Sequence, residues 1–113
     1  MRMITAIIRP GRYTEVRDAL SELGVQGLTV TEVRGFGRQR GRTEFYRGAE
    51  YEIAETPKLR IDVVVPSGLE EAALDAISEA ARTGKTGDGM VFTGPVTGAR
   101  RIRTGEEKDD ALR

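Results

Sequence analysis

The order of strand and helix signals along the chain restricts its fold more than any other feature. Met3 to Arg9 (MITAIIR) is short and rich in β-branched residues, which indicates a buried strand. From Arg12 to Leu23 the apolar residues follow helical spacing, and Gly24 stands where a helix C-cap belongs. Strand character resumes from Val25 to Val33. This part of the chain therefore predicts a strand–helix–strand unit.

The remainder of the chain repeats that order without a clear sequence repeat. Leu59 to Val65 alternates in hydrophobicity and predicts a strand, and the alanine-rich run from Leu69 to Arg82 predicts a second helix. A short strand is expected over Met90 to Phe92 and a last one over about Val96 to Arg103, before a charged tail (about 104–113) that we expect to fray. The order βαββαβ predicts an α+β, ferredoxin-like fold with an antiparallel sheet.

Apolar residues occupy both faces of the predicted strands. Ile7 stands beside Ile8, and Val64 beside Val65, although neighbouring residues of a strand point to opposite faces. In a ferredoxin-like fold the helices cover only one sheet face. An apolar second face predicts that the protein is a homo-oligomer.

The chain length sets the scale of any ligand site. With 113 residues the chain forms one domain, residues 1–113, that buries roughly two-thirds of its unfolded surface. Such a domain has no room for a large interior cavity. We therefore expect ligands in surface clefts or between subunits.

The composition argues against several classes of function. Eighteen basic and eighteen acidic residues balance, which leaves no electrostatic footprint for nucleic acid. The absence of histidine and cysteine removes most nucleophilic and acid–base chemistry, most zinc and iron–sulfur sites, and disulfides. Apolar runs are too short for a membrane span or a signal peptide. We expect a cytoplasmic protein that is not an enzyme and carries no prosthetic group.

Glycines and arginines alternate after the second predicted strand. Glycine lets backbone N–H groups approach an anion, and arginine binds phosphate or carboxylate in a bidentate manner. The spacing of Gly35, Gly37 and Gly41 is not the dinucleotide fingerprint, because the third glycine is one position late and no helix follows. Residues from about Gly35 to Thr56 lack periodicity, which predicts a long functional or disordered loop. A flexible hairpin connection is the alternative. The arginines of this segment are Arg34, Arg38, Arg40, Arg42 and Arg47.

Three further features could serve a phosphorylated ligand or a modifying enzyme. Gly84 to Gly89 (GKTGDG) lacks the first glycine of a Walker loop, since Glu79 stands there, but it predicts an anion-facing turn or an ordinary tight turn. Arg101 and Arg103 fall on one face of the last predicted strand, where they could grip a polyphosphate or simply protect a strand edge. Tyr51, between two glutamates in the long loop, is either a modification site or an ordinary exposed tyrosine.

Three stretches resemble the PII signal-transduction family: TVTEVRGFGRQRGRTEFYRGAEY from residue 29, TGKTGDG from residue 83 and RIRTGE from residue 101. The resemblance covers essentially the whole chain. It implies a homotrimeric, non-enzymatic sensor of nitrogen, carbon and energy status that binds ATP or ADP competitively between subunits, and 2-oxoglutarate together with Mg-ATP. It also implies that a long loop (the T-loop, about residues 37–55) controls ammonium channels and enzymes of nitrogen metabolism.

The resemblance further implies roles for individual residues. Arg101, Ile102 and Arg103 would reach the nucleotide from the neighbouring subunit. Gln39 would help to hold Mg²⁺ and 2-oxoglutarate, Lys58 would pair with a carboxylate of that acid, and Tyr51 would be the target of a nucleotidylyltransferase. The full nucleotide-binding set is Thr29, Gly35, Gly37, Arg38, Val64, Gly87, Asp88, Gly89, Arg101, Ile102 and Arg103.

The chain departs from the family pattern at three places. Met90 replaces the lysine of a GDGK motif, and one lost charge-assisted contact costs roughly 1.5–3 kcal/mol, or about ten- to a hundredfold in affinity. Glu52 to Thr56 (EIAET) differs from the usual V-x-D-F-L run, and Arg42 replaces a common histidine. These departures favour, as an alternative, a divergent PII-like sensor with altered nucleotide preference and no 2-oxoglutarate response.

Two other classes of function are weaker alternatives. A small acylphosphatase-like enzyme would need a nucleophile or a base, and none is visible. A nucleic-acid binder would need net positive charge and an aromatic-rich strand, and the chain has neither.

Overall fold

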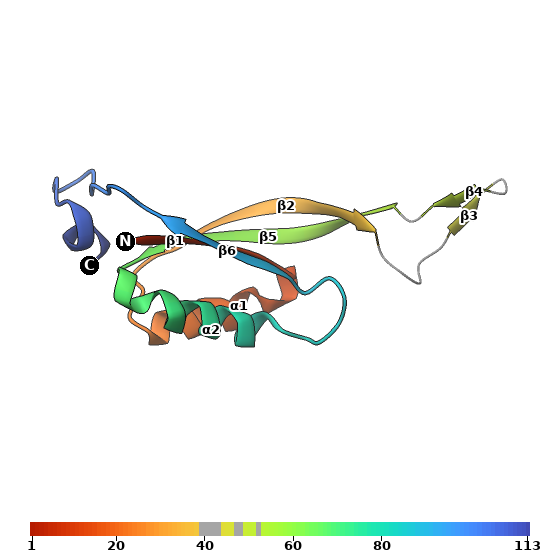
Figure 1. Cartoon of the computed structure of the whole chain (residues 1–113), viewed down its shortest axis with the longest axis horizontal. Helices are drawn as coiled ribbons and strands as arrows, with labels where there is room; N and C mark the ends of the chain where they lie inside the picture. The colour runs from red at the N-terminus through yellow and green to blue at the C-terminus, as the bar shows by residue number, and fades with distance from the viewer. Residues whose placement is uncertain (39–43, 47–48, 52) are drawn as a thin grey trace.

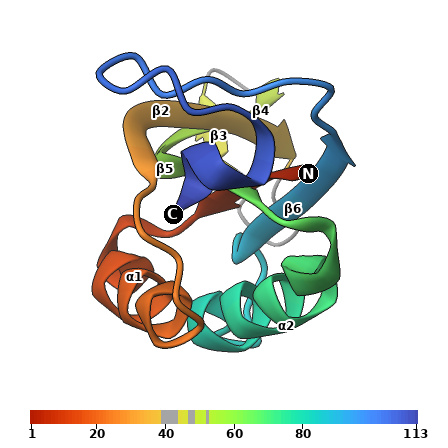
Figure 2. The same ribbon diagram turned by 90° about the vertical axis from the view of Figure 1, so that its left-hand side faces the viewer.

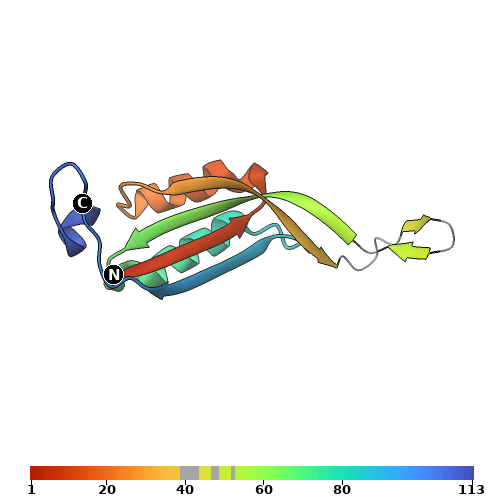
Figure 3. The same cartoon turned by 90° about the horizontal axis from the view of Figure 1, so that it is seen from above.

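The structure is a computed structural model that describes residues 1–38, 44–46, 49–51 and 53–113. Four long strands form one antiparallel sheet in the order β2-β5-β1-β6 (Figures 1 and 3). Two helices lie against one face of this sheet, as Figure 2 shows end-on. The predicted α+β, ferredoxin-like arrangement is confirmed. The elements are β1 (Arg2–Ile8), α1 (Tyr13–Glu22), β2 (Thr29–Arg38), β3 (Glu44–Tyr46), β4 (Ala49–Tyr51), β5 (Ile53–Val65), α2 (Glu70–Ala81) and β6 (Gly89–Pro95), with 3₁₀ turns at Pro10–Arg12, Ser67–Leu69 and Lys108–Leu112.

The hydrophobic core lies between the sheet and the two helices. Alternate residues of the central strands are buried, because successive side chains of a strand point to opposite faces. The helices present residues spaced by about one turn toward them. The buried core residues are Ile4, Ala6, Ile8, Val16, Leu20, Ile61, Val63, Val65, Ala73, Ile77 and Ala81.

Both helices begin and end near the predicted positions. Gly24 adopts φ of 87° two residues after the end of α1, and its N–H donates to the carbonyl of Ser21 at 3.0 Å. A left-handed glycine of this kind ends a helix without a steric penalty. Arg12 connects the start of α1 to the end of α2, since its Nε donates to the carbonyl of Ala80 at 3.1 Å.

The strands at the centre of the chain differ from the prediction. β2 begins at Thr29 instead of Val25, and it runs on to Arg38, while β5 begins at Ile53 instead of Leu59. The two strands stay paired beyond the helices, from Gly35 opposite Thr56 to Arg38 opposite Ile53. A two-stranded ribbon without a core face has no reason to alternate in hydrophobicity, so sequence periodicity does not reveal it.

The prediction of a last strand over about Val96 to Arg103 is wrong. β6 covers the predicted short strand and ends at Pro95, after which the described chain forms only an isolated bridge between Arg100 and Glu107. The chain turns back on itself, because the Arg101 N–H donates to the Glu106 carbonyl at 2.8 Å. Arg101 and Arg103 therefore do not project from one face of a strand. The tail that we expected to fray contains the 3₁₀ turn Lys108–Leu112.

The sheet face away from the helices, here called the open face, carries apolar side chains on β1 and β6 beside charged ones on β5. The register places Met3 opposite Val64 and Ile7 opposite Met90. Phe92 stands on the same face and is 53% exposed, and Met90 is 62% exposed. Within the described residues, no helix is long and apolar enough to cross a membrane.

Candidate functional site

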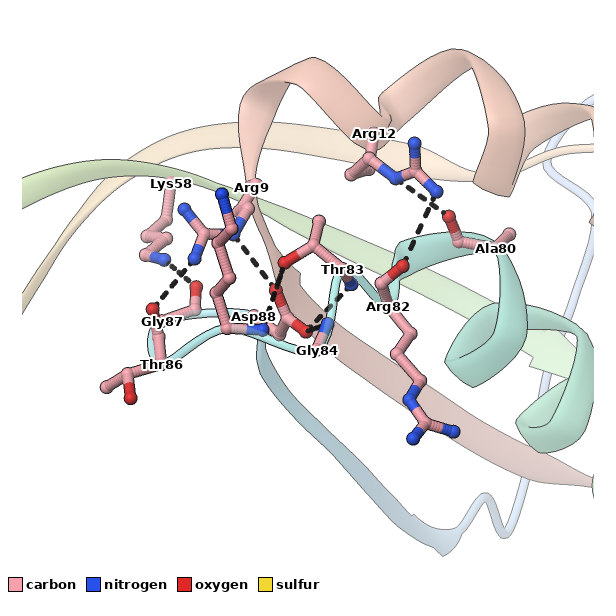
Figure 4. Close-up of polar contacts among 11 residues, drawn as sticks. Arg9, Arg12, Lys58, Ala80, Arg82, Thr83, Gly84, Thr86, Gly87 and Asp88 are labelled. Atoms are coloured by element: carbon pink, nitrogen blue, oxygen red, sulfur yellow. Dashed lines mark hydrogen bonds and ion pairs between the residues drawn. The ribbon is translucent and has the colours of Figure 1, made fainter.

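The connection between α2 and β6, residues 83–89, is organised around the carboxylate of Asp88 (Figure 4). One oxygen, Oδ2, accepts the backbone N–H groups of Thr83 and Gly84, both at 2.8 Å. The other, Oδ1, accepts the Thr83 hydroxyl and, at 3.0 Å, the Nε of Arg9. The Thr83 hydroxyl bond is the main reason that the pKa of Asp88 lies well below its usual range. Arg9 and the two backbone N–H groups add to this effect and outweigh the opposing effect of desolvation.

Two cationic side chains reach the 83–89 loop from the sheet. Arg9, which follows β1, donates from Nη2 to the Thr86 carbonyl at 2.7 Å. Lys58, on β5, donates from Nζ to the Gly87 carbonyl. Partial burial lowers the pKa of Lys58, and the charge of Arg9 lowers it further, while the charge of Asp88 acts in the opposite direction.

Glycine is required at two positions of the loop. Gly89 has φ of 108°, and a Cβ there would overlap the backbone carbonyl of Ile7. Gly87 has φ of 99°, and a Cβ there would lie 3.3 Å from Nη2 of Arg9 and 3.6 Å from Nζ of Lys58. These glycines let the loop pass close to β1 and to both cations.

The loop has the features of an anion-binding turn. The N–H groups of Thr86 and Gly87 have no hydrogen-bond acceptor among the described residues. Arg9 and Lys58 together exceed the single negative charge of Asp88 by one positive charge. Neighbouring backbone N–H groups with an adjacent positive charge attract phosphate and carboxylate groups.

A second group of predicted residues lies near the end of β5. Thr29, Val64 and Arg101 line one cavity of about 880 Å³, together with Asp62 and residues of the C-terminal turn. The Arg101 guanidinium donates to the carbonyls of Ala111, at 3.2 Å, and Arg113. Ile102 is 99% exposed, and Arg103 is exposed as well.

A single chain does not bring the two groups together. Gly35 and the 83–89 loop both lie beside Lys58 at one end of the sheet. A Cβ on Gly35 would lie 3.3 Å from Cγ of Lys58, and Lys58 Nζ donates to the Gly87 carbonyl. The cavity lined by Arg101 also includes Asp109, Ala111 and Leu112 of the C-terminal turn. Figure 1 shows that this turn lies at the other end of the sheet. The seven residues of β6 extend over about 20 Å, and this strand spans most of the distance between the two groups.

Two of the remaining predicted residues belong to the β2-β5 ribbon, and Tyr51 belongs to the separate two-stranded sheet of β3 and β4. Gly37 and Arg38 end β2 opposite Ala54 and Ile53, and Tyr51 ends β4 opposite Glu44. Gln39, predicted for Mg²⁺ and 2-oxoglutarate, lies outside the described residues. The described residues contain no group of three acidic side chains placed to hold a metal ion.

Sequence reasoning missed Arg9 and Thr83. Arg9 is separated from Asp88 by 79 positions, so no local pattern connects them. Thr83 precedes Asp88 by five positions and follows a helix end, which is the only sequence signal for this contact.

The fold defines a small α+β domain of the ferredoxin-like kind. The family model described as "Nitrogen regulatory protein P-II" matches residues 1–106. Proteins of that name from Haemophilus influenzae and Azospirillum brasilense are each 53% identical over 112 residues, covering 99% of this chain and 100% of their own length. "Nitrogen regulatory protein P-II 1" of Escherichia coli K12 is 52% identical with the same coverage. The chain belongs to the P-II family of nitrogen regulatory proteins, which act in signal transduction and are not enzymes.

Proposed function

We propose that this protein is a PII-type sensor that binds ATP and ADP in clefts between the subunits of a homotrimer. The observation that carries the proposal is the 83–89 loop, where N–H groups that have no acceptor among the described residues stand beside Arg9 and Lys58. A polyphosphate needs several positive charges and backbone donors, and this loop offers both. The identity of the base rests on the family resemblance.

The distribution of the site residues supports a shared site. The loop and the cavity lined by Arg101 lie at opposite ends of the sheet. A head-to-tail contact between copies would place Arg101 and Arg103 of one subunit against the loop of the next. Head-to-tail contacts that close form rings, and the apolar side chains of the open face supply surface to bury in one.

We assign the nucleotide-binding residues by subunit. One subunit provides Arg38 and the backbone of Gly87, Asp88 and Gly89 for the phosphates, with Gly35 and Gly37 at the base of the ribbon. Its neighbour provides Thr29 and Val64 beside the adenine, Arg101 and Arg103 for the phosphates, and Ile102 against the base. The common cavity of Thr29, Val64 and Arg101 supports their assignment to the same subunit.

We assign the second ligand to the side of the loop that faces β5. Gln39 would hold Mg²⁺ and 2-oxoglutarate, and Lys58 would pair with a carboxylate of the acid. Lys58 donates to the Gly87 carbonyl in this structure, so the acid would compete with that carbonyl for the ammonium group.

A divergent sensor is the second candidate function, and Met90 favours it. Met90 follows the Gly87–Gly89 turn directly and cannot supply the charge of a lysine. Such a protein would bind adenylates with altered preference and would not respond to 2-oxoglutarate.

The output would pass through the long loop, about residues 37–55. By binding one loop conformation better than another, the ligands would shift its population. The loop would then control ammonium channels or enzymes of nitrogen metabolism, and Tyr51 would accept a nucleotidyl group. The protein would be cytoplasmic and would reach the membrane only through a channel partner.

Titration calorimetry with ATP, ADP, AMP and 2-oxoglutarate, with and without Mg²⁺, tests the proposal. We expect ATP and ADP to bind, and the Arg101→Ala, Arg103→Ala double variant to lose that binding while sedimentation shows an intact oligomer. Arg100→Ala is the matched control, because Arg100 pairs with Glu107 on the surface. Binding retained by the double variant would move the site elsewhere. No heat with any adenylate would end the proposal.

A further inference from the structure

The carboxylate of Asp88 is fully engaged within the protein. Its two oxygens accept four hydrogen bonds, from Thr83 N, Gly84 N, the Thr83 hydroxyl and Arg9 Nε. A free carboxylate beside a phosphate chain would repel it, whereas a carboxylate that is bound by these donors is neutralised and held in place. The side chain of Asp88 therefore shapes the loop, and only its backbone is available to a ligand.

Arg9 joins the loop to the sheet at two points. Its Nε reaches Asp88 and its Nη2 reaches the carbonyl of Thr86, so one planar guanidinium spans the turn that contains Gly87. Arg9 directly follows β1, whose alternate side chains lie in the core. The loop is thereby fixed to the end of an internal strand of the sheet.

Thr83 closes the other side of the loop. α2 ends at Ala81, and Arg82 is extended, so the chain leaves the helix just before Thr83. Both the hydroxyl and the N–H of Thr83 bind the Asp88 carboxylate, which joins the first residues of the loop to its last. The N–H groups of Thr86, Gly87 and Asp88 lie in the turn closed in this way.

We infer that Arg9 and Thr83 are positioning residues that act through the Asp88 carboxylate and hold the 83–89 loop in its phosphate-binding shape before the ligand arrives. This inference rests on the proposed nucleotide-binding function. Binding to a loop that is already ordered avoids the free-energy cost of ordering it. If the loop is open part of the time, the apparent affinity for the ligand is lower.

Two independent variants test the inference in the full chain. Thr83→Val keeps the shape of the side chain and removes its donor, and Arg9→Lys keeps the charge but cannot reach two acceptors through one planar group. Thr83→Ser restores the hydroxyl. Matched controls on α1 are Thr14→Val, at an exposed position, and Arg17→Lys, whose arginine pairs with Asp18 on the surface.

Two measurements are needed, one without any ligand. Amide hydrogen exchange of ligand-free protein should be faster at residues 83 and 84 in Thr83→Val and Arg9→Lys, because both N–H groups bind the Asp88 carboxylate. Calorimetry with ATP should show roughly ten- to a hundredfold weaker binding in the same two variants, the range expected for a hydrogen bond to a charged group. Thr83→Ser and both controls should resemble the wild type.

The outcomes separate this inference from the proposed function. Wild-type exchange rates and wild-type ATP affinity in both Thr83→Val and Arg9→Lys would overturn the inference and leave the proposed function intact. A wild-type protein that binds no adenine nucleotide would overturn the proposed function. The exchange measurement would then still show whether Asp88 holds the loop.

Discussion

Lys58 is the residue whose electrostatic environment is most informative. Its ammonium group is partly buried, lies beside Arg9 and Asp88, and donates to the carbonyl of Gly87. Burial and the Arg9 charge both oppose protonation, and Asp88 favours it. The pKa of Lys58 therefore reports directly on the arrangement of the 83–89 loop.

We predict that Arg9→Gln raises the pKa of Lys58 and that Asp88→Asn lowers it. The first removes a neighbouring positive charge and the second removes a negative one. NMR titration of the Lys58 side chain measures both shifts, with Arg17→Gln as the control. An unchanged or lower pKa in Arg9→Gln would contradict the assigned arrangement.

The lowered pKa of Lys58 also makes the stability of the fold depend on pH. Because the pKa of Lys58 is lower in the folded than in the unfolded protein, the unfolded state binds more protons between the two pKa values. The free energy of unfolding therefore rises with pH between the folded-state and unfolded-state pKa values of Lys58. Below both values Lys58 is charged in the folded and the unfolded protein, and its partial burial destabilises the fold to the full extent.

Met90 leaves the start of β6 without a positive charge. The side chain is 62% exposed at the start of β6, directly after the turn proposed to bind phosphates. Met90→Lys should strengthen ATP and ADP binding by roughly ten- to a hundredfold, because it adds a charge-assisted contact. Calorimetry beside Met90→Leu, which adds no charge, measures the effect. Equal affinities in Met90→Lys and the wild type would refute the prediction.

Among the elements, β6 depends on a single backbone position. Gly89 starts the strand with φ of 108°, against the carbonyl of Ile7. Such a backbone conformation is costly for any residue with a Cβ, and here a Cβ would also meet β1.

Gly89→Ala should lower the free energy of unfolding by at least roughly 1–3 kcal/mol, from strain and from displacement of β6. Urea unfolding at fixed protein concentration measures the change. Gly68→Ala is the control, since a Cβ there meets nothing within 4 Å. Equal transition midpoints for the two variants would show that the strand start adapts without cost.

At the scale of the whole molecule, the open face is the largest feature that one chain leaves unexplained. Ile7, Met90 and Phe92 share this face with Val64. At its centre Asp62 accepts the Thr5 hydroxyl at 2.6 Å and Arg60 Nε at 3.0 Å. Burial raises the pKa of Asp62, but these hydrogen bonds and the Arg60 charge outweigh it and lower the pKa. A carboxylate that is hydrogen-bonded in this way is not left without partners when another subunit covers it.

Phe92→Glu should shift the proposed homotrimer toward monomers. A glutamate buried in an interface without a partner costs several kcal/mol, roughly 3–5 for an uncompensated buried charge. Sedimentation velocity across a dilution series measures the shift. Phe36→Glu is the matched control, because Phe36 is 70% exposed on the ribbon beyond the helices. A wild-type protein that sediments as a monomer would contradict the shared site.

Much of the core could be predicted from the sequence because its signals are local. Period-two alternation in Leu59–Val65 identified the buried face of β5, and helical spacing identified both helices. The family motifs lie in contiguous stretches, so the P-II family was also recognisable from the sequence.

What the sequence determined by itself is the order of the long strands and helices up to β6, the buried face of β5 and the family, since all three depend on neighbouring residues. The tertiary structure alone decided that β2 and β5 continue as a ribbon to Arg38 and Ile53, and that the chain after Pro95 forms no strand. It also decided that Arg9 meets Asp88, and that Arg101 lies far from the Gly87 turn within one chain. Each of these outcomes depends on which distant strand or loop a segment contacts. Hydrophobic periodicity does not reveal the pairing of strands that are exposed on both faces, or contacts between residues that are far apart in the sequence.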